Sequence, residues 1–253
     1  MSITELLFGL LVVVTQFIEA ITGFGSTVMA LPFAITLTSV ATAVPVLTLH
    51  TWLFAAWVLI VDFKKIVLRQ YLTVMIFVLL GLPIGMWAVS VLPEATLRLS
   101  LAVFMIAVSI NGMIRCFKKE SDSKISPPQG AKRAFLYLLL FLGGIIHGAF
   151  STGGPLVIIY VTLVIQEKGS FRATMCSVWF SLNTIILARF LITGSFTSEV
   201  TRLSLISLPF LLAGVLLGIW VHKRISNKQF TRFVYIVLFL SGCFLAYSTL
   251  TSG

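Results

Sequence analysis

The stretch Ile21-Thr22-Gly23-Phe24-Gly25-Ser26-Thr27 decides the fold, because it interrupts an apolar run with glycines and hydroxyl side chains. From Ala20 to Val61 the chain has no Asp, Glu, Lys or Arg. A similar stretch, Phe150-Ser151-Thr152-Gly153-Gly154-Pro155, interrupts a second charge-free run that extends from Ala134 to Gln166. A membrane-spanning helix needs about 20 apolar residues, so both runs are too long for one simple helix. We therefore predict two broken membrane segments, one in each half of the chain.

The composition of the whole chain indicates a membrane protein. Of the 253 residues, 58% are hydrophobic and only 10% are charged, and the mean hydropathy is +1.08. An ordinary soluble domain has about 25% charged residues, because polar groups must cover a surface that faces water. The net charge of +10 comes from short basic clusters between apolar runs, which is typical of a polytopic membrane protein and not of a nucleic-acid-binding one. The composition excludes a soluble enzyme, a disordered chain and a secreted disulfide scaffold.

The apolar segments form two similar sets of four. We predict membrane segments at about residues 5–38, 42–61, 70–91, 97–115, 134–165, 172–193, 202–221 and 231–250. The pattern Gly81-Leu-Pro-Ile-Gly85-Met-Trp87 recurs as Gly214-Val-Leu-Leu-Gly218-Ile-Trp220, and GxxxG favours close contact between helices. We therefore predict an all-α polytopic membrane protein with two repeats, each a broken segment followed by three plain helices. The repeats are residues 1–117 and 134–253, joined by a basic cytoplasmic linker at 118–133.

The basic residues indicate that the second repeat is inverted relative to the first. If every segment crossed the membrane once, the turns on the two sides would hold ten and seven basic residues, a weak positive-inside bias. If the two broken segments fold back as re-entrant hairpins, Arg98 and Arg202 lie on one side and Arg189 stays inside a helix. The turns on the other side then hold three, six, two and four basic residues, at 62–70, 115–133, 167–172 and 222–232. We therefore predict re-entrant hairpins in both halves and both termini outside.

The two breaks are the predicted substrate site. Inverted repeats with paired broken helices are an architecture of secondary transporters, and their substrates bind where the breaks meet. Helix N-termini have free N–H groups and a partial positive charge, so they bind anions, and hydroxyl groups add donors. The expected anion-binding residues are Gly23, Gly25, Ser26, Thr27, Ser151, Thr152, Gly153 and Gly154. For either break alone, the alternative is a kinked packing helix with small residues at its interface.

Ionisable and polar residues inside apolar segments are costly to bury and are usually functional. Glu19 and His147 lie on the helical arms that enter the two breaks, and His50 lies in the middle of its segment. Each of these three could carry a coupling proton. Arg189 could attract an anion, and Asn183 is a further polar candidate for the substrate site. A structural role stays open for each: a hydrogen-bonded carboxyl, packing histidines, an arginine that reaches the membrane interface, and an amide between helices.

No motif in the sequence indicates an enzyme or a bound cofactor. There is no phosphate-binding loop, no HExxH and no Cys/His metal cluster. The three cysteines, Cys116, Cys176 and Cys243, are far apart in the chain and match no redox or metal spacing. We therefore predict no enzymatic activity, no cofactor, no metal site and no nucleic-acid partner. Transport would be passive or coupled to an ion gradient.

The two broken segments resemble those of the sulfite exporter family of the TauE/SafE type, also called the 4-toluene sulfonate uptake permease family. The residues that carry the resemblance are Glu19–Gly25 and Gly144–Leu156, and the length, segment count and basic linker extend it over nearly the whole chain. The resemblance implies a transporter of the bacterial inner membrane that exports sulfite or an organosulfonate. Many members have a longer glycine run at the second break, where this chain has Ser151. Transport of another organic anion and a non-transporting accessory subunit are the alternatives.

Overall fold

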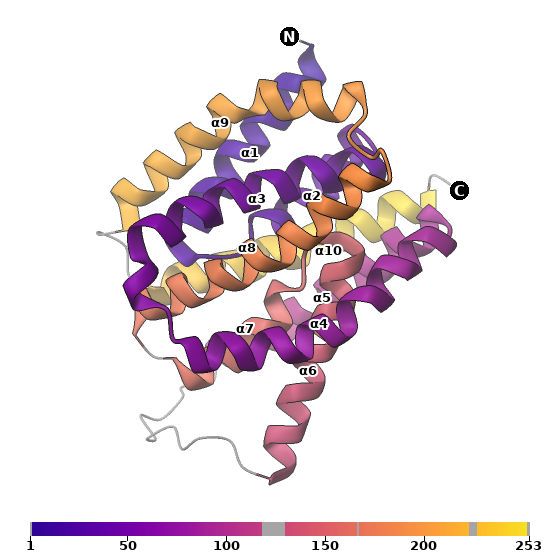
Figure 1. The fold of residues 1–253 in the computed structure, drawn as a ribbon. Helices are drawn as coiled ribbons and strands as arrows, with labels where there is room; N and C mark the ends of the chain where they lie inside the picture. The colour runs from indigo at the N-terminus through magenta and orange to yellow at the C-terminus, as the bar shows by residue number, and fades with distance from the viewer. Residues whose placement is uncertain (1, 118–129, 166, 223–226, 252–253) are drawn as a thin grey trace.

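The computed structural model describes residues 2–117, 130–165, 167–222 and 227–251, and this part of the chain is helical throughout apart from short connections (Figure 1). Helices α1 (Ile3–Thr22) and α2 (Ser26–Leu37) are separated by the first break, and α6 (Gly130–Phe150) and α7 (Gly154–Val164) by the second. Three long helices follow each pair. They are α3 (Val40–Asp62), α4 (Leu68–Val91) and α5 (Glu94–Phe117), then α8 (Lys168–Ile192), α9 (Ser198–His222) and α10 (Asn227–Thr251), with a short 3-10 helix, η1 (Phe63–Lys65), after α3. The predicted order of one broken segment and three helices is confirmed in both halves.

The described helices include seven that are long and apolar enough to cross a membrane: α1, α3, α4, α5, α6, α8 and α9. Helices α2 and α7 are apolar but shorter. Large apolar side chains such as Ile60, Leu80 and Val103 are more than half exposed on these helices, as expected where hydrocarbon replaces water. Residues 118–129 of the predicted linker lie outside the described residues, and residues 130–133 already belong to α6, because Ala131, Lys132 and Arg133 are good helix formers.

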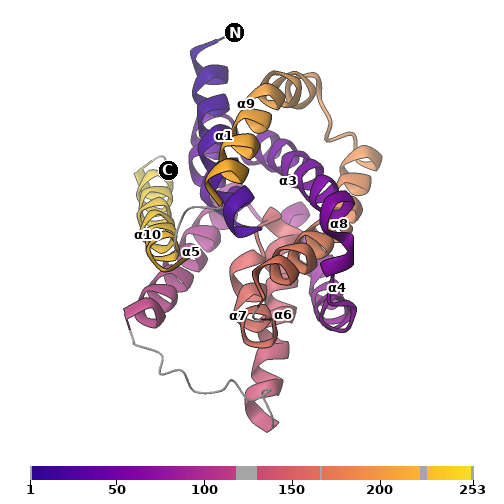
Figure 2. The same ribbon diagram turned by 90° about the vertical axis from the view of Figure 1, so that its left-hand side faces the viewer.

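The repeated GxxxG pattern brings helices of opposite halves together. Helix α4 crosses α6 in close contact, and a Cβ atom at Gly81 or Gly148 would overlap the main chain of the facing helix. Helix α9 crosses α1 in the same way (Figure 2). A Cβ atom at Gly214 would lie 2.5 Å from the carbonyl oxygen of Val13. The prediction that this pattern mediates close helix contact is confirmed at both copies, and each copy faces the broken helix of the other half.

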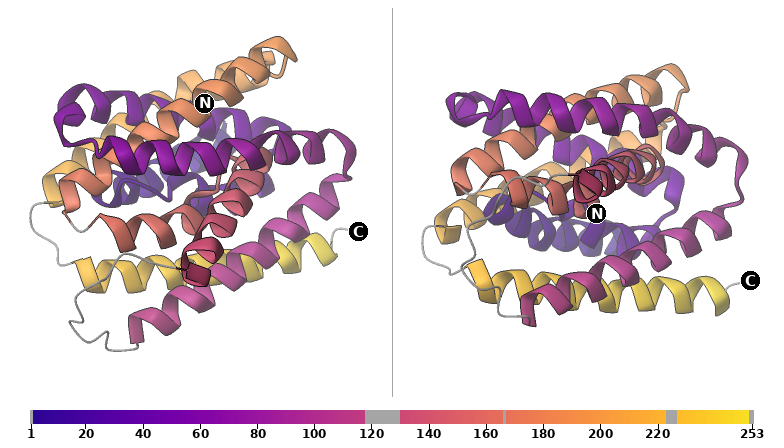
Figure 3. Two further views of the ribbon diagram at one scale, coloured as in Figure 1. Left: turned by 60° about the horizontal axis from the view of Figure 1, so that its bottom comes forward. Right: turned by 90° about the horizontal axis from the view of Figure 1, so that it is seen from below.

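Two further helix pairs join the halves. Helix α3 packs against α8, and α5 packs against α10 at one edge of the bundle (Figure 3). Exchanging the two halves converts the α1–α9 pair into the α6–α4 pair and leaves the α3–α8 and α5–α10 pairs unchanged. The inter-helix contacts therefore have the pattern that two related halves would produce.

The turns before α4 and before α8 lie at the same end of the molecule. Asp62 at the end of α3 forms an ion pair with Arg172 in the first turns of α8, and the Lys65 side chain lies beside Gly169. This end is at the left of Figure 1, whereas both chain termini lie toward the top and right. Single crossings by every predicted segment would have put these two turns on opposite sides.

Candidate functional site

The two breaks begin with the same local geometry. Gly23 has φ +80° and its N–H donates to the Glu19 carbonyl at 2.6 Å. Ser151 has φ +55° and its N–H donates to the His147 carbonyl at 2.7 Å. Each is a left-handed residue that ends a helix by capping a carbonyl one turn back. Glu19 and His147 therefore occupy equivalent positions, each four residues before the residue that ends its helix.

Ser151 takes a conformation that normally favours glycine. A non-glycine residue with positive φ is uncommon, and the left-handed region costs about 1 kcal/mol. The Thr48 hydroxyl, from α3, donates to the Ser151 hydroxyl at 2.7 Å, and both side chains are buried. This bond holds the serine in place.

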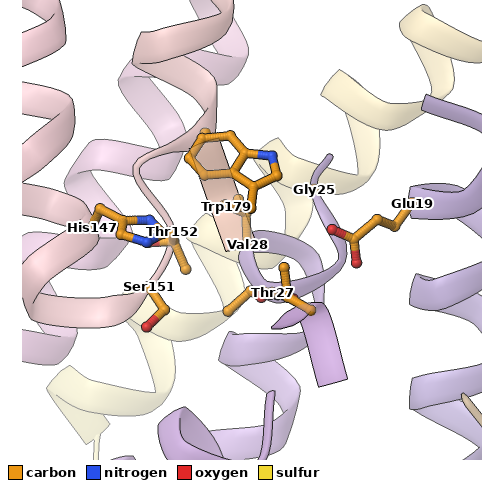
Figure 4. A pocket seen from close by; sticks show the side chains of 10 residues that line it. Glu19, Gly25, Thr27, Val28, His147, Ser151, Thr152 and Trp179 are labelled. Carbon is orange, nitrogen blue, oxygen red and sulfur yellow. Dashed lines mark hydrogen bonds between the residues drawn. The ribbon is translucent and has the colours of Figure 1, made fainter. Parts of the chain in front are cut away.

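A small cavity lies between the two breaks (Figure 4). It is lined from α1 and the start of α2, from α3, from the second break and from α8. Glu19 lies on one side of the cavity and His147, Ser151 and Thr152 lie on the other. The lining residues are Glu19, Gly25, Thr27, Val28, Thr51, His147, Ser151, Thr152, Gly154 and Trp179. The breaks, which are about 128 residues apart in the chain, thus meet in space.

On the first side of the cavity, the polar groups hydrogen-bond to one another. The Ser26 hydroxyl donates to the Glu19 carboxyl, and both side chains are buried. The Thr51 hydroxyl of α3 lies 2.9 Å from that of Thr27 and 3.3 Å from that of Ser26. This network fixes the first turn of α2 against α1 and α3. It orients the Glu19 carboxyl at the edge of the cavity.

On the second side, several buried polar atoms have no partner among the described residues. His147 Nε2 donates to Asn183 Oδ1 at 3.0 Å, and its ring stacks on Trp179 with centroids 5.4 Å apart. The unpartnered atoms are His147 Nδ1, Thr152 Oγ1 and Asn183 Nδ2. Of these residues, His147 and Thr152 line the cavity, so their unpartnered atoms can meet a ligand there.

The start of each short helix adds further donors. Neither α2 nor α7 has a side chain that caps its first N–H groups; glycine, Gly25 or Gly153, stands at the capping position in each. Uncapped N–H groups at a helix start need an acceptor. Both helices begin at the cavity. The arrangement therefore offers backbone donors from two helices, and hydroxyl donors, to a small ligand that accepts hydrogen bonds.

The predicted site residues divide into three groups. Gly25, Thr27, Ser151, Thr152 and Gly154, together with Glu19 and His147, line the cavity. Gly23, Ser26, Gly153 and Asn183 stand behind the lining and hold it in place. His50 and Arg189 do not line the cavity.

The two predicted residues outside the cavity have other surroundings. His50 is fully buried and its Nε2 lies 3.1 Å from the Ser207 hydroxyl of α9. Arg189 is half-buried in the last turn of α8, where its carbonyl accepts from the Thr193 N–H at 2.9 Å. Two of the three cysteines noted in the sequence are described here: Cys176 is buried and Cys243 is exposed.

Sequence analysis missed three lining residues, Val28, Thr51 and Trp179. One signal could have found Thr51. Thr48 and Thr51 are three residues apart in an apolar segment, so both hydroxyls fall on one face of a helix. No such signal distinguishes Trp179 from the other tryptophans, because an aromatic residue in a membrane helix is ordinary.

Replacing Thr152 with valine is expected to weaken anion binding about tenfold or more. The change removes an unpartnered hydroxyl but keeps the side-chain shape, and a hydrogen bond to a charged group contributes about 1.5–3 kcal/mol. The measurement is the half-saturating concentration of sulfite in transport by purified, reconstituted protein. Thr36→Val is the control, because the Thr36 hydroxyl already donates to the Pro32 carbonyl of its own helix. Equal affinity in parent and Thr152→Val protein would remove Thr152 from the site.

A family model described as sulfite exporter TauE/SafE matches residues 7–245 of the chain. No curated protein and no solved structure matches it significantly.

Proposed function

Because the chain belongs to the sulfite exporter TauE/SafE family of multi-pass membrane transporters, we propose that it moves sulfite or an organosulfonate across the bacterial inner membrane by alternating access. The observation that carries this proposal is the cavity between the breaks. There, two uncapped helix starts and the unpartnered Thr152 hydroxyl converge. Such donors suit the oxygen atoms of a small anion.

We also propose that the two halves are inverted repeats and that their relative movement exposes the cavity to each side in turn. Three features support this proposal: the exchange pattern of the helix pairs, the equivalent positions of Glu19 and His147, and the turns before α4 and α8 at one end. Secondary transporters with this architecture bind substrate near the midplane, where the repeats meet. Both termini would then face outside.

Glu19 makes proton coupling the favoured mechanism. Among the described residues that line the cavity there is no Lys or Arg, and Glu19 is the one acidic side chain. An ionised carboxylate and an anion in the same low-dielectric cavity would repel strongly. The anion therefore binds together with a proton on Glu19, and the two move together. His147, at the equivalent position across the cavity, is the second candidate for carrying a proton.

A neighbouring apolar cavity favours an organosulfonate over sulfite as the physiological substrate. This second cavity shares Gly25 and Val28 with the first in its lining. The rest of its lining is Phe24, Met29, Pro155, Ile158 and Tyr235. An anionic group held at the breaks could thus place a short apolar group beside Ile158. Sulfite has no such group and would leave this cavity unused.

The test is anion flux into proteoliposomes that contain the purified protein, with and without an imposed pH gradient. We expect saturable sulfite flux that responds to the gradient and is inhibited by alkanesulfonates. Ile158→Trp should fill the second cavity and weaken inhibition by butanesulfonate about tenfold, while inhibition by methanesulfonate changes little, since each buried methylene contributes about 0.8 kcal/mol. Ile84→Trp, at an exposed position of α4, is the control.

The possible outcomes separate the alternatives. If Ile158→Trp changes inhibition by butanesulfonate and by methanesulfonate equally, the second cavity does not hold the apolar group of a sulfonate. A small inorganic anion would then be the substrate. Flux of carboxylates alone would identify another organic anion. Absence of flux for every anion, from protein shown to be folded, would favour the accessory-subunit alternative.

A further inference from the structure

The first turns of α8 lie directly against the first break. A Cβ atom on Gly23 would come within 2.8 Å of Arg172 Cγ, and Arg172 Nη1 donates to the Ala20 carbonyl at 3.5 Å. The neighbouring ring of Phe171 packs edge-on against Phe24, with centroids 6.4 Å apart. A helix end inside a membrane leaves carbonyl groups that need donors. Arg172 supplies one, so it braces the end of α1.

The position of Arg172 depends on Asp62. Arg172 Nη2 lies 2.6 Å from Asp62 Oδ2, and Lys65 Nζ lies 2.8 Å from Asp62 Oδ1. The exposed fractions of the Asp62 and Arg172 side chains are 7% and 16%, against 54% for Lys65. A nearly buried ion pair is strongly disturbed when one partner is removed, because the remaining charge is left unpaired. The Arg172–Asp62 pair is therefore the core of this contact and Lys65 is peripheral.

The pair joins three elements. Asp62 ends α3, Arg172 begins α8, and the braced carbonyl ends α1 just before the break. The ion pair lies at the end of the molecule that has the basic turns before α4 and α8. The cavity lies beyond the pair, because Glu19 and Gly25 flank the braced segment and line the cavity. Opening the cavity toward this end requires α8 to separate from the first break.

We propose that Arg172, held by Asp62, is a positioning residue that closes the cavity toward the end with the basic turns, and that this ion pair breaks when the cavity opens there. The proposal rests on the proposed function, because it assigns a role in alternating access. It requires no knowledge of the substrate. A test that detects access to the cavity without transport therefore separates its failure from failure of the proposed function.

The experiment uses a cysteine reporter in the cavity, Val28→Cys, in full-length protein whose three native cysteines are replaced by alanine. A membrane-impermeant maleimide is applied to intact cells or to inside-out vesicles. A separate Lys64→Cys protein, labelled at an exposed position of η1, identifies the side with the basic turns. We expect Asp62→Asn and Arg172→Gln each to raise the labelling rate of the reporter about tenfold from that side and not from the other.

Two controls test the specificity of the effect. Lys65→Gln removes the peripheral partner, and Arg202→Gln removes an ion pair with Glu5 that joins α1 to α9 elsewhere. Neither should change labelling from the basic side. The double variant Asp62→Arg, Arg172→Asp restores opposite charges and should return labelling toward the parental rate.

Unchanged labelling in folded Asp62→Asn and Arg172→Gln proteins would overturn the proposal. Labelling that rises equally from both sides would also overturn it, because it would indicate general loosening. If neither single variant folds, the double variant Asp62→Arg, Arg172→Asp tests the proposal instead. Folded protein with parental labelling supports the proposal, and failure to recover folding contradicts it.

Discussion

Gly148→Leu should leave almost no folded protein, because Gly148 of α6 sits directly on the main chain of α4. A Cβ atom there would overlap the Leu82 carbonyl oxygen and would lie 3.0 Å from the Met86 nitrogen. Main-chain atoms cannot move aside as a side chain can, so the two helices must separate. Overpacking of this kind costs about 1–3 kcal/mol or more, and loss of helix contact in lipid removes the packing that drives association.

The expected result is at least about a tenfold loss of monodisperse protein in detergent, since about 1.4 kcal/mol corresponds to a factor of ten. Gly214→Leu should have a similar effect through the Val13 carbonyl of α1. Ala213→Leu is the matched control, because Ala213 is the neighbouring residue of α9 and is exposed. Parental yield and thermal stability of Gly148→Leu protein would show that α4 and α6 do not pack as described.

Glu19→Gln should abolish transport driven by a pH gradient while anion exchange continues. Glutamine keeps the size of the carboxyl and can still accept the hydrogen bond from Ser26, but it cannot release a proton. It therefore resembles protonated Glu19 permanently. The anion still binds. However, the protein without substrate cannot change back to its other conformation, so anion flux cannot be coupled to the pH gradient.

We expect gradient-driven sulfite flux to fall by about two orders of magnitude, equivalent to about 3 kcal/mol, while exchange of labelled for unlabelled anion stays near the parental rate. In the parent, raising the pH on both sides removes the proton from Glu19 and slows binding of the anion. In Glu19→Gln protein, this part of the pH dependence disappears. Glu5→Gln is the control, because Glu5 is paired with Arg202 away from the cavity. Gradient-driven flux that survives Glu19→Gln would exclude Glu19 as the proton carrier.

The sequence by itself determined the features of this protein that are local along the chain. Segment lengths follow from runs without charge, and the helix breaks at Gly23–Gly25 and at Ser151–Gly153 follow from glycine and hydroxyl residues within those runs. The GxxxG pattern identified the glycines that allow close helix contact. The placement of basic residues indicated that the turns before α4 and α8 share a side. Each of these properties needs only neighbouring residues and the thickness of a bilayer.

Only the tertiary structure decided which face of each helix points to the cavity. Helix α3 presents Thr51 to the cavity and turns His50 toward Ser207 of α9, although the two residues are adjacent. The Arg172–Asp62 pair joins residues 110 positions apart. A soluble helix reveals its buried face by an apolar stripe. A membrane helix is apolar toward lipid and toward protein alike, so its sequence carries little information about rotation, and packing against distant helices selects the residues of the site.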